Sequence, residues 1–579
     1  MARKHHVCLG VSFGHGDSSA ALIVDGCLVA AVEEERFTRI KHDAGFPHNA
    51  VTYCLKHAGL TGRDVSVVAV ARNPRAHFFR RMRMLIAHPA LGQRPPENAT
   101  HAISLSKELK KLGITRARHY RMEHHLAHLL SARYLSGDES PALLSIDGLG
   151  DFVSVAMGKP SGHSVEIVER LFFPHSLGFF YTALTQYLGF PHYGDEFKVM
   201  GLSSCGRNEY GDAMQALVRE KQGFGFELNL EAFPILKHPL QFTIEKRQPK
   251  IKPFYNTAFL TQVIGLPPRK PIDPITDAHR NLAASVQARF EEIANRLVGQ
   301  LHERVGMEAL ALSGGCAHNS VWVGKIPRRT PYQKVFVAPA SHDAGLAVGA
   351  AIGAAQSEIR PESHHWALLG PDLAEMDPAS TPVPEGIHHE VFNDDASLIQ
   401  WMVEQLSQEK ILGLVDGRLE FGPRALGSRS ILADPRRGYM KQRLNDRVKH
   451  REAFRPFAAS VLAEHQTLWF KNTFECPTME GVFVVEDLIR DRIPAVVHAD
   501  NTCRIQTVEK KSQPFYWELI EAFRKKTGVP MILNTSFNDS EPIVCTPQDA
   551  LRCFNNTDLD FLVVGRNVYT KGNKASLSA

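Results

Sequence analysis

The stretch ALLSIDGLGDFVSVAM, residues 142–157, decides the fold, because it places an acidic glycine turn between two apolar segments. Residues 142–146 and 152–157 have the composition of buried strands, and residues 147–151 have that of a tight turn. The same order occurs near the amino terminus, where residues 7–12 and 20–32 are expected to form strands and Asp25-Gly26 is the turn signal. This repetition predicts a duplicated α/β unit.

Two further segments end a predicted strand in glycines and then begin a helix. Residues 309–312 lead into Ser313-Gly314-Gly315, and residues 335–337 lead into an alanine-rich stretch that begins at Asp343. Such a turn leaves backbone N–H groups free for a phosphate or a carboxylate. Close packing explains one such turn equally well, but two in the same half of the chain favour a nucleotide-like ligand.

Chain length and proline content predict two domains. The 579 residues exceed what one ordinary hydrophobic core organises. Residues 357–385 lose the regular hydrophobic pattern and contain five prolines, which is typical of a linker. We therefore predict an amino-terminal domain over residues 1–360, a linker over 361–385 and a carboxy-terminal domain over 386–579.

Charge and cysteine content exclude several classes of protein. The 67 basic and 62 acidic side chains give a net charge of +5, which is small for a dedicated nucleic-acid binder. The 9 cysteines form no C-x-x-C pair, which argues against a disulfide framework or a zinc knuckle and favours a reducing compartment. The sequence shows no signal-type or membrane-spanning apolar stretch. We expect a cytoplasmic protein without a nucleic-acid or membrane partner, and a homodimer is compatible with the sequence.

The motif Glu123-His124-His125-Leu126-Ala127-His128 lies in a segment whose leucines and alanines fit a buried helix. His124 and His128 are four residues apart, so both imidazoles project from one helix face and can reach one metal ion. In a chain with 28 histidines such a pair also arises by chance, and two packing histidines are the simpler alternative.

Two aspartates favour the metal interpretation. Asp147 closes a predicted strand at a glycine turn, and Asp343 is expected at a helix N-terminus. Two histidines with one or two carboxylates form a mixed nitrogen and oxygen site, suited to Fe(II), Mn(II) or Zn(II) with positions open for substrate. We predict a metal site of His124, His128, Asp147 and Asp343, for which the residues alone do not choose among the three metals.

An arginine-rich loop marks the carboxy-terminal domain. Residues 417–430, GRLEFGPRALGSRS, space arginines with glycines, which suits bidentate contacts to phosphate oxygens better than it suits packing. A dense basic run follows over residues 441–455; alone it fits a solvated helix, but beside the loop it favours a polyphosphate site. Polar side chains at the ends of predicted strands add weaker support: His498, Arg504, Asn534 and Ser536.

Charged loops near the amino terminus supply further candidates. His15-Gly16-Asp17 follows the first predicted strand, and residues 33–42 place acids and bases side by side after the first hairpin. A solvated loop is the commoner reason for such a run. A lysine there, Lys41, could also bind a carbonyl oxygen or a phosphate.

Several of these motifs resemble one known family. The arginine loop, followed by ILADPR at residues 431–436 and REAFRPF at 451–457, looks like the carboxy-terminal signature of the NodU/CmcH/TobZ-type O-carbamoyltransferases of nodulation-factor and antibiotic biosynthesis. Residues 35–42 (ERFTRIKH), the helical histidine pair and residues 194–198 (GDEFK) resemble the other half of that family. The resemblance covers nearly the whole chain.

The resemblance implies an α/β fold: a duplicated actin-like ATPase-type amino-terminal domain and a carboxy-terminal domain like the YrdC threonylcarbamoyl-adenylate synthase. It also implies that the carboxy-terminal domain makes carbamoyl-adenylate from ATP, with Mg(II), and carbamoyl phosphate. The residues that would bind these substrates are Arg424, Lys449, Arg455, His498, Arg504, Asn534 and Ser536. The residues that would bind the adenylate are Lys41, Asp147, Gly178 and Gly315.

The implied second stage transfers the carbamoyl group to a hydroxyl of a small-molecule natural product. A carbamoyl carbonyl is a poor electrophile because nitrogen donation quenches it, so an AMP leaving group and a metal ion, with Fe(II) favoured, both lower the barrier. The hydroxyl must lose its proton as it attacks. His15 and Asp17 are the candidate bases, and Lys41 would orient the adenylate.

Some residues depart from the family pattern, and other functions compete with this one. His318, Asn501 and Ser540 stand where the family pattern has other residues. An RNA-directed carbamoyl-type modification factor is the alternative from a different class. A hydrogenase-maturation carbamoyltransferase would carry C-x-x-C motifs, and an actin-like chaperone would lack the second ATP-binding domain. The acceptor stays open; residues 224–271 are expected to form its wall or a surface insertion.

Overall fold

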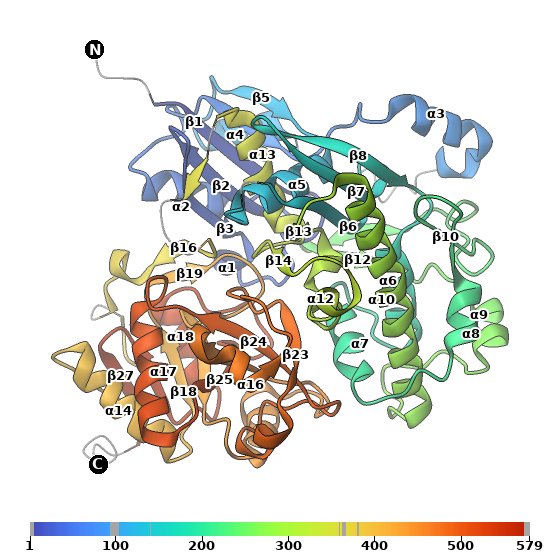
Figure 1. The fold of residues 1–579 in the computed structure, drawn as a ribbon. Helices are drawn as coiled ribbons and strands as arrows, with labels where there is room; N and C mark the ends of the chain where they lie inside the picture. The colour runs from blue at the N-terminus through green and yellow to red at the C-terminus, as the bar shows by residue number, and fades with distance from the viewer. Residues whose placement is uncertain are drawn as a thin grey trace. The chain divides into compact units, whose positions relative to one another are not determined.

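The computed structural model describes residues 5–92, 104–138, 140–357, 359–361, 366–378 and 381–572 (Figure 1). The chain divides into an amino-terminal unit, Met1–Trp322 with Ile326–Arg360, and a carboxy-terminal unit, Val323–Lys325 with Pro361–Ala579. Part of the predicted linker is structured, because β16 (Leu368–Asp372) pairs with β19 (Arg418–Glu420) inside the carboxy-terminal unit. Residues 362–365 and 379–380 of that linker lie outside the described residues.

The amino-terminal unit contains two sheets with the same strand arrangement. In the first, β1 (Val7–Ser12), β2 (Ser19–Val24) and β3 (Cys27–Glu33) form an antiparallel meander, and β4 (Val67–Val70) and β5 (Arg118–Arg121) continue from β1 in parallel. In the second, β6 (Ala142–Gly150), β7 (Val153–Ser161) and β8 (Ser164–Phe172) form the meander, and β13 (Ala309–Ser313) and β14 (Lys334–Val337) continue from β6. The predicted duplication of an α/β unit is confirmed.

The correspondence between the two copies differs from the prediction. The β6–β7 hairpin, which contains residues 147–151, corresponds to the β1–β2 hairpin and its loop 13–18, and not to the Asp25-Gly26 turn. Residues 147–150 are also strand: β6 runs to Gly150 with an irregular register after Ile146, and the turn itself is Asp151-Phe152, both at positive φ. Asp147 therefore projects from a bulged strand.

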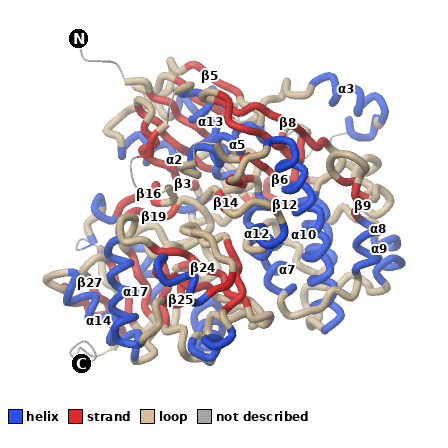
Figure 2. Tube along the Cα trace, viewed as in Figure 1, coloured by secondary structure: helices blue, strands red, loops and turns tan. Residues whose placement is uncertain are grey.

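Two helices fill the space between the sheets. α5 (His124–Leu135) packs on β6, β7 and β13, α13 (Leu346–Ala355) packs on β1, β2 and β4, and the helices pack on each other (Figure 2). α13 is apolar on all sides, as a helix buried between two layers must be. A Cβ atom at Gly10 would lie 1.8 Å from the Ala347 carbonyl oxygen, and one at Gly349 would lie 1.9 Å from that of Ala127. Only glycine permits these approaches.

Further helices of this unit pack beside the second sheet. They include α6 (Leu177–Tyr187), α7 (Glu196–Ser203) and the long α10 (Asp277–Val305). Residues 224–271, expected to be an acceptor wall or an insertion, contribute Phe226 and Phe233 to the core, where both are fully buried. Their hairpin of β11 (Phe242–Glu245) and β12 (Gln248–Ile251) reaches Asp43, whose carboxylate lies 2.8 Å from the Arg247 guanidinium.

The carboxy-terminal unit is built on one sheet of ten strands, which contains the strands predicted at residues 411–415, 531–533 and 561–564. The strands, in spatial order, are β17 (Ile387–Val391), β27 (Asn567–Lys571), β26 (Phe561–Val564), β18 (Leu412–Val415), β20 (Arg429–Ala433), β25 (Met531–Ser536), β21 (Ala458–Leu462), β24 (Thr502–Val508), β23 (Gly481–Val485) and β22 (Phe470–Lys471). α18 (Pro547–Asn555) begins at the predicted Thr546 cap, which forms a capping box with Asp549. Among the described residues, no helix has both the length and the apolar composition needed to cross a membrane.

The glycine contacts generate a prediction about packing. Gly349→Val should lower the free energy of unfolding of the amino-terminal unit by about 2 kcal/mol or more, because its side chain meets the backbone of α5. The matched control is Gly299→Ala in α10, where a Cβ atom meets nothing within 4 Å. This change should raise the same free energy by about 0.5–1 kcal/mol, since alanine is the better helix former. Chemical denaturation of both variants measures the difference, and shifts of the same sign would contradict the packing argument.

Candidate metal centre and anion-binding site

The four predicted metal ligands converge in the amino-terminal unit. His124 Nε2 lies 3.1 Å from Asp147 Oδ2 and 3.5 Å from Asp343 Oδ1. His128 Nε2 lies 3.3 Å from Asp147 Oδ2 and 3.7 Å from Asp343 Oδ1. The four ligand atoms lie within 4.8 Å of one another. Residues separated by more than two hundred positions in the sequence thus meet at one point.

The spacing of these atoms fits a metal ion. Four donors about 2.1 Å from one tetrahedral ion are about 3.4 Å apart, whereas charge-assisted hydrogen bonds are about 2.7–2.9 Å long. The observed separations match the first arrangement better. Asp343 Oδ1 is buried and makes no hydrogen bond within ordinary distance, which leaves a lone pair for an ion. The residues present therefore fit a divalent metal ion that accepts nitrogen and oxygen ligands.

Local structure orients each ligand. Glu123 caps α5 by accepting hydrogen bonds from the His125 and Leu126 amides, so the histidine pair begins at the first turn of the helix. The bulge of β6 turns Asp147 so that its Oδ1 accepts from the Gly148 amide at 2.7 Å and the Gly315 amide at 3.2 Å. Its Oδ2 then faces the histidines. The amides near Gly315 were predicted to bind a ligand, but the Gly315 amide donates to Asp147 instead.

Contacts behind the ligands fix the two imidazole rings. His128 Nδ1 lies 3.1 Å from Ser313 Oγ, whose hydroxyl donates to the Ser341 carbonyl oxygen at 3.4 Å. Ser313 is therefore an acceptor for Nδ1–H, which leaves His128 Nε2 to face the carboxylates. Gly150 packs on the other ring, because a Cβ atom there would lie 2.0 Å from His124 Cγ.

The charges of the centre are those of a cation site. Burial raises the pKa of Asp147 and Asp343, but the neighbouring histidines, His124 and His128 for Asp147 and His15 for Asp343, lower both below the usual range. Burial lowers the pKa of His128, but contacts with Asp147 and Asp343 raise it to about 9. Both carboxylates are therefore ionised near neutral pH.

The predicted bases each form a pair with another residue. His15 Nδ1 lies 2.8 Å from Asp343 Oδ2, so His15 contacts a metal-ligand candidate directly. Asp17 Oδ1 accepts a hydrogen bond from His42 Nδ1 at 2.8 Å. Burial raises the pKa of Asp17, but the charges of His42 and His342 lower it to about 2, which makes the carboxylate a weak base. His42 is the better-placed proton acceptor of this pair.

Of the remaining residues predicted in this unit, Gly178 packs on this centre, whereas Lys41 lies beside the neighbouring His42–Asp17 pair. Lys41 is exposed, and its carbonyl oxygen accepts a hydrogen bond from Gln248 at 3.3 Å, next to the His42–Asp17 pair. Gly178, at the start of α6, packs so tightly on the Asp147 bulge that a Cβ atom would lie 2.8 Å from the Gly148 Cα atom. Asp17 and His42 also form a second group of ligand types with Glu35, but both Glu35 oxygens already accept hydrogen bonds from Arg36 and the His42 amide.

The carboxy-terminal unit brings together one buried and three half-buried cations, namely Lys449, Arg451, Arg455 and Arg504. Burial, and then neighbouring positive charge, lowers the pKa of Lys449 and Arg451 well below the usual range and that of Arg504 to about 9. Arg455 contributes to the shift of all three. Arg451 Nη2 and Arg504 Nε are buried without a hydrogen-bond partner. Cations that crowd together with unsatisfied donors form a site for a polyanion.

The other predicted residues of this unit border that cluster. The pKa of Arg504 is lowered by Arg424, whose guanidinium lies 3.2 Å from Glu480. Lys449 donates to the carbonyl and side-chain oxygens of both Ser536 and Asn538, so a phosphate at this ammonium group would have to replace one of these contacts. Asn534 and Arg504 both pair with Ala458, so they occupy one row across β25, β21 and β24.

His498 occupies a more enclosed position. Its Nε2 lies 3.2 Å from the Phe457 carbonyl oxygen and its Nδ1 lies 3.2 Å from Thr502 Oγ1. Burial lowers its pKa to about 4, so the ring is neutral at neutral pH. With both ring nitrogens engaged, His498 holds the turn before β24, and its predicted contact to ATP would need a rearrangement.

The interpretation of the arginine loop is wrong in one respect. Arg429 is fully buried, and its guanidinium donates to the carbonyl oxygens of Asp416, Gly417, Ser428 and Cys545. Arg418 similarly donates to the Leu369 carbonyl oxygen at 2.8 Å. These two arginines hold strands together, because backbone carbonyl oxygens of the adjoining loops and of β16 accept hydrogen bonds from their guanidinium groups.

Some residues of both sites were not identified from the sequence. His42 and Arg451 lie within recognisable sequence motifs. Their neighbours in space, Asp17 for His42 and Arg504 for Arg451, could not be assigned without the fold. Ser313 and Glu480 carry no sequence signal beyond their residue type. A glycine-rich strand end at Ser313 was the nearest indication.

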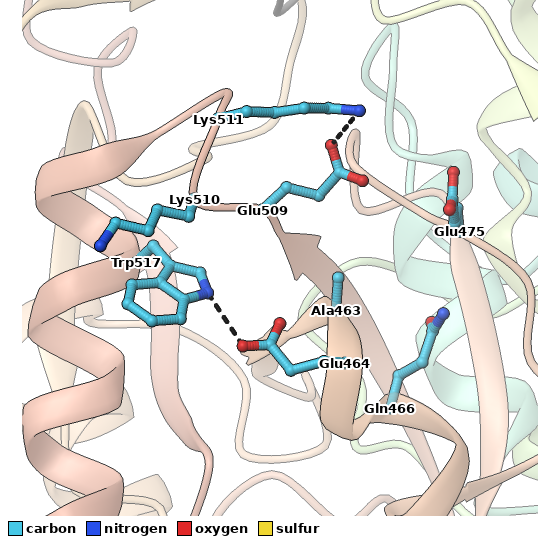
Figure 3. Close-up of a pocket in the computed structure, with 8 residues that line it drawn as sticks. All are labelled: Ala463, Glu464, Gln466, Glu475, Glu509, Lys510, Lys511 and Trp517. Atoms are coloured by element: carbon cyan, nitrogen blue, oxygen red, sulfur yellow. Dashed lines mark hydrogen bonds and ion pairs between the residues drawn. The ribbon is translucent and has the colours of Figure 1, made fainter.

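A surface pocket of about 450 Å³ in the carboxy-terminal unit is separate from these residues (Figure 3). It is lined by Ala463, Glu464, Gln466, Glu475, Glu509, Lys510, Lys511 and Trp517. Trp517 Nε1 donates to Glu464 at 3.1 Å, and Lys511 pairs with Glu509 at 3.3 Å. Its three carboxylates would repel phosphate groups, so the pocket does not compete with the cation cluster as a nucleotide site.

Two family models match the two halves of the chain, and both describe carbamoyltransferases. A family model for the carbamoyltransferase N-terminus matches residues 7–352, and one for the carbamoyltransferase C-terminus matches residues 403–571. An uncharacterized protein of Synechocystis is 34% identical over 97% of this chain and 96% of its own length. Nodulation protein NolNO of Sinorhizobium fredii is 36% identical, over 96% of this chain and 79% of its own. Nodulation protein NolO of Bradyrhizobium diazoefficiens is also 36% identical, over 77% and 78%.

Solved structures are more distant. Component A of the (R)-2-hydroxyglutaryl-CoA dehydratase of Acidaminococcus fermentans aligns with 14% identity and a TM-score of 0.33, covering 61% of this chain and 98% of that chain. These values are too low to support an inference about function.

The metal centre can be tested by its ion content. The wild-type protein should bind one divalent ion per chain, and His128→Ala should weaken binding at least ~100-fold because a ligand is lost. Ser313→Ala should weaken it about 10–100-fold, since the ring loses its orienting partner. The control is His119→Ala, at an exposed histidine of β5. Elemental analysis after dialysis and chelator competition give the affinities; unchanged binding by His128→Ala would show that the ion lies elsewhere.

Proposed function

The chain belongs to the carbamoyltransferase family, and we propose that it is an ATP- and carbamoyl-phosphate-dependent O-carbamoyltransferase. In this proposal the carboxy-terminal unit makes carbamoyl-adenylate from ATP and carbamoyl phosphate. The amino-terminal unit then transfers the carbamoyl group to a hydroxyl of a small-molecule natural product. The observation that carries the proposal is the convergence of His124, His128, Asp147 and Asp343 in a chain whose other unit gathers buried and half-buried cations.

The cation cluster is assigned to ATP and carbamoyl phosphate. Lys449, Arg455 and Arg504, with Arg451 added by the structure, would hold the phosphates, and Mg(II) would accompany the ATP. These cations repel one another and are partly desolvated. A bound polyphosphate would offset that repulsion by forming charge-assisted hydrogen bonds with them. Asn534 and Ser536 lie at the end of β25 beside Lys449, where they would contact the nucleotide.

The metal centre is assigned to the transfer step. His124, His128, Asp147 and Asp343 would hold the ion, with Fe(II) favoured and Mn(II) or Zn(II) as alternatives. When bound, a divalent ion supplies positive charge that draws electron density from a carbonyl oxygen. The residues of the chain position the ligands: Ser313 orients His128, and the Gly148 and Gly315 amides orient Asp147. Lys41, next to His42 in the chain, would orient the adenylate.

Two histidines are positioned to take the proton of the acceptor hydroxyl. His15 and His42 each have Nδ1 in contact with a carboxylate, Asp343 and Asp17 respectively. That contact places the proton of a neutral ring on Nδ1 and leaves Nε2 as the proton acceptor. We infer that Asp17 acts by orienting His42, which replaces its predicted role as a base.

The proposal includes a cytoplasmic location. None of the nine cysteines forms a disulfide bond, and six of them are buried. A chain with nine cysteines and no disulfide suits a reducing compartment.

The two half-reactions should separate by mutation. Arg424→Ala should lower the rate of carbamoyl-adenylate formation about 10²–10³-fold, because one charged contact to the phosphates is lost. His128→Ala should leave that rate unchanged and abolish transfer to an acceptor. Adenylate and AMP are measured by mass spectrometry with purified protein, ATP and carbamoyl phosphate, under anaerobic conditions with Fe(II).

The control for this experiment is Arg437→Ala, because Arg437 is exposed and paired only on the surface with Glu409. Its rates should equal those of the wild-type protein. Absence of adenylate and AMP in the wild-type reaction would refute the function, and equal loss of both half-reactions in His128→Ala would refute the division between the units. Tight tRNA binding without carbamoyl phosphate turnover would support the RNA-directed alternative.

A further inference from the structure

Helix α3 (Phe78–Ala87) exposes an apolar face. Phe79 is 87% exposed and Ile86 is 75% exposed, and no residue of the helix is buried. The large exposed apolar residues of α3 are Phe78, Phe79, Met82, Leu85 and Ile86. They are five of the eleven such residues in the described part of the chain. A concentration of this kind on ten residues marks an interaction surface.

These five side chains lie on one side of the helix. At 100° per residue, positions 78, 79, 82, 85 and 86 span an arc of about 120°. Arg81 and Arg83 flank this arc, and Arg80 lies opposite it. The helix is therefore amphipathic, with its apolar side in contact with solvent and not with the protein core.

Contacts of Arg80, opposite the apolar arc, and of Arg81, at its flank, hold α3 in this orientation. The Arg80 guanidinium lies 3.8 Å from the centre of the Phe172 ring of β8, and Arg81 donates to the Pro74 carbonyl oxygen at 2.9 Å. Figure 1 shows α3 at the edge of the amino-terminal unit, apart from the other labelled helices of that unit. The arginines bind the helix to the body, and the apolar face points away from it.

The sequence around α3 is strongly basic. Residues 72–92 contain five arginines and no aspartate or glutamate. The next residues of the chain, 93–103 (QRPPENATHAI), lie outside the described residues. The missing partner must therefore offer both apolar contact and negative charge.

We propose that α3 docks the protein on the surface of an anionic lipid bilayer. The acyl region near the headgroups would take up the apolar face, and lipid phosphates would face Arg75 and Arg83. The ten-residue helix is too short to span the bilayer, so it would lie in the plane of the interface. A second copy of the chain fits less well, because the flanking arginines of two helices would face each other.

This proposal changes the expectation that the protein has no membrane partner. That expectation came from the lack of a membrane-spanning segment, and a surface helix needs none. One short helix with a few arginines gives reversible attachment, which should weaken as salt screens the charges. The proposal is independent of the reaction assigned to the chain.

Vesicle binding by the full-length protein tests the proposal. The protein should cosediment with vesicles of phosphatidylcholine and phosphatidylglycerol, and at least about tenfold less with phosphatidylcholine alone. Phe79→Ser with Ile86→Ser should reduce binding to the mixed vesicles at least about tenfold. The matched control, Ile272→Ser with Leu488→Ser, removes two equally exposed apolar residues outside α3 and should bind as the wild type does.

A second measurement reports insertion directly. Phe79→Trp places an indole on the apolar face, and its fluorescence should be quenched by brominated acyl chains in mixed vesicles. Equal binding to both vesicle types, or full binding by the Phe79/Ile86 variant with an unchanged thermal midpoint, overturns the proposal. Self-association of the wild-type protein without vesicles, lost in the same variant, would assign the face to a second copy.

Discussion

The close packing of α5 against α13 is the constraint on which the metal centre depends. Gly349 brings the two helices together at the Ala127 backbone, and Gly10 brings α13 onto β1. Because α5 carries the histidine pair and Asp343 precedes α13, the same contacts set the distance between His128 and Asp343. Because α5 packs on the second sheet and α13 on the first, the distances within this site depend on the fold of both sheets.

Local sequence patterns predicted the helices and strands well. The features that they did not predict depend on contacts between residues far apart in the sequence. Strands, the α5 histidine pair and the Thr546 cap follow from residue periodicity and capping, which are properties of neighbours in sequence. The bulge at Asp147 and the match of its hairpin with β1–β2 depend on strand register, which the sequence does not encode locally. The convergence of four candidate metal ligands was predictable from residue type and position, whereas the pairs Asp17–His42 and His15–Asp343 needed the fold.

The candidate sites of the two units carry opposite charges. In the amino-terminal unit the ionised carboxylates of Asp147 and Asp343 lie beside the imidazoles of two histidines, which is the charge pattern of a cation site. In the carboxy-terminal unit lysine and arginine side chains are partly desolvated next to each other. The crowded cations of the carboxy-terminal unit do not lower the free energy of the fold, since buried like charges repel and lose hydration. A ligand of opposite charge would offset that cost.

Arginine illustrates why residue type alone misleads. Arg429 lies in a loop that resembles a phosphate clamp, yet carbonyl oxygens accept from its guanidinium, so nothing remains for a ligand. Arg504 is also largely enclosed, but its Nε lacks a partner and neighbouring cations lower its pKa. Arg83 is exposed beside an apolar face, where only an outside partner can use it. The three share a side chain and differ in how fully the protein satisfies its donors, and that difference separates a structural arginine from a ligand-binding one.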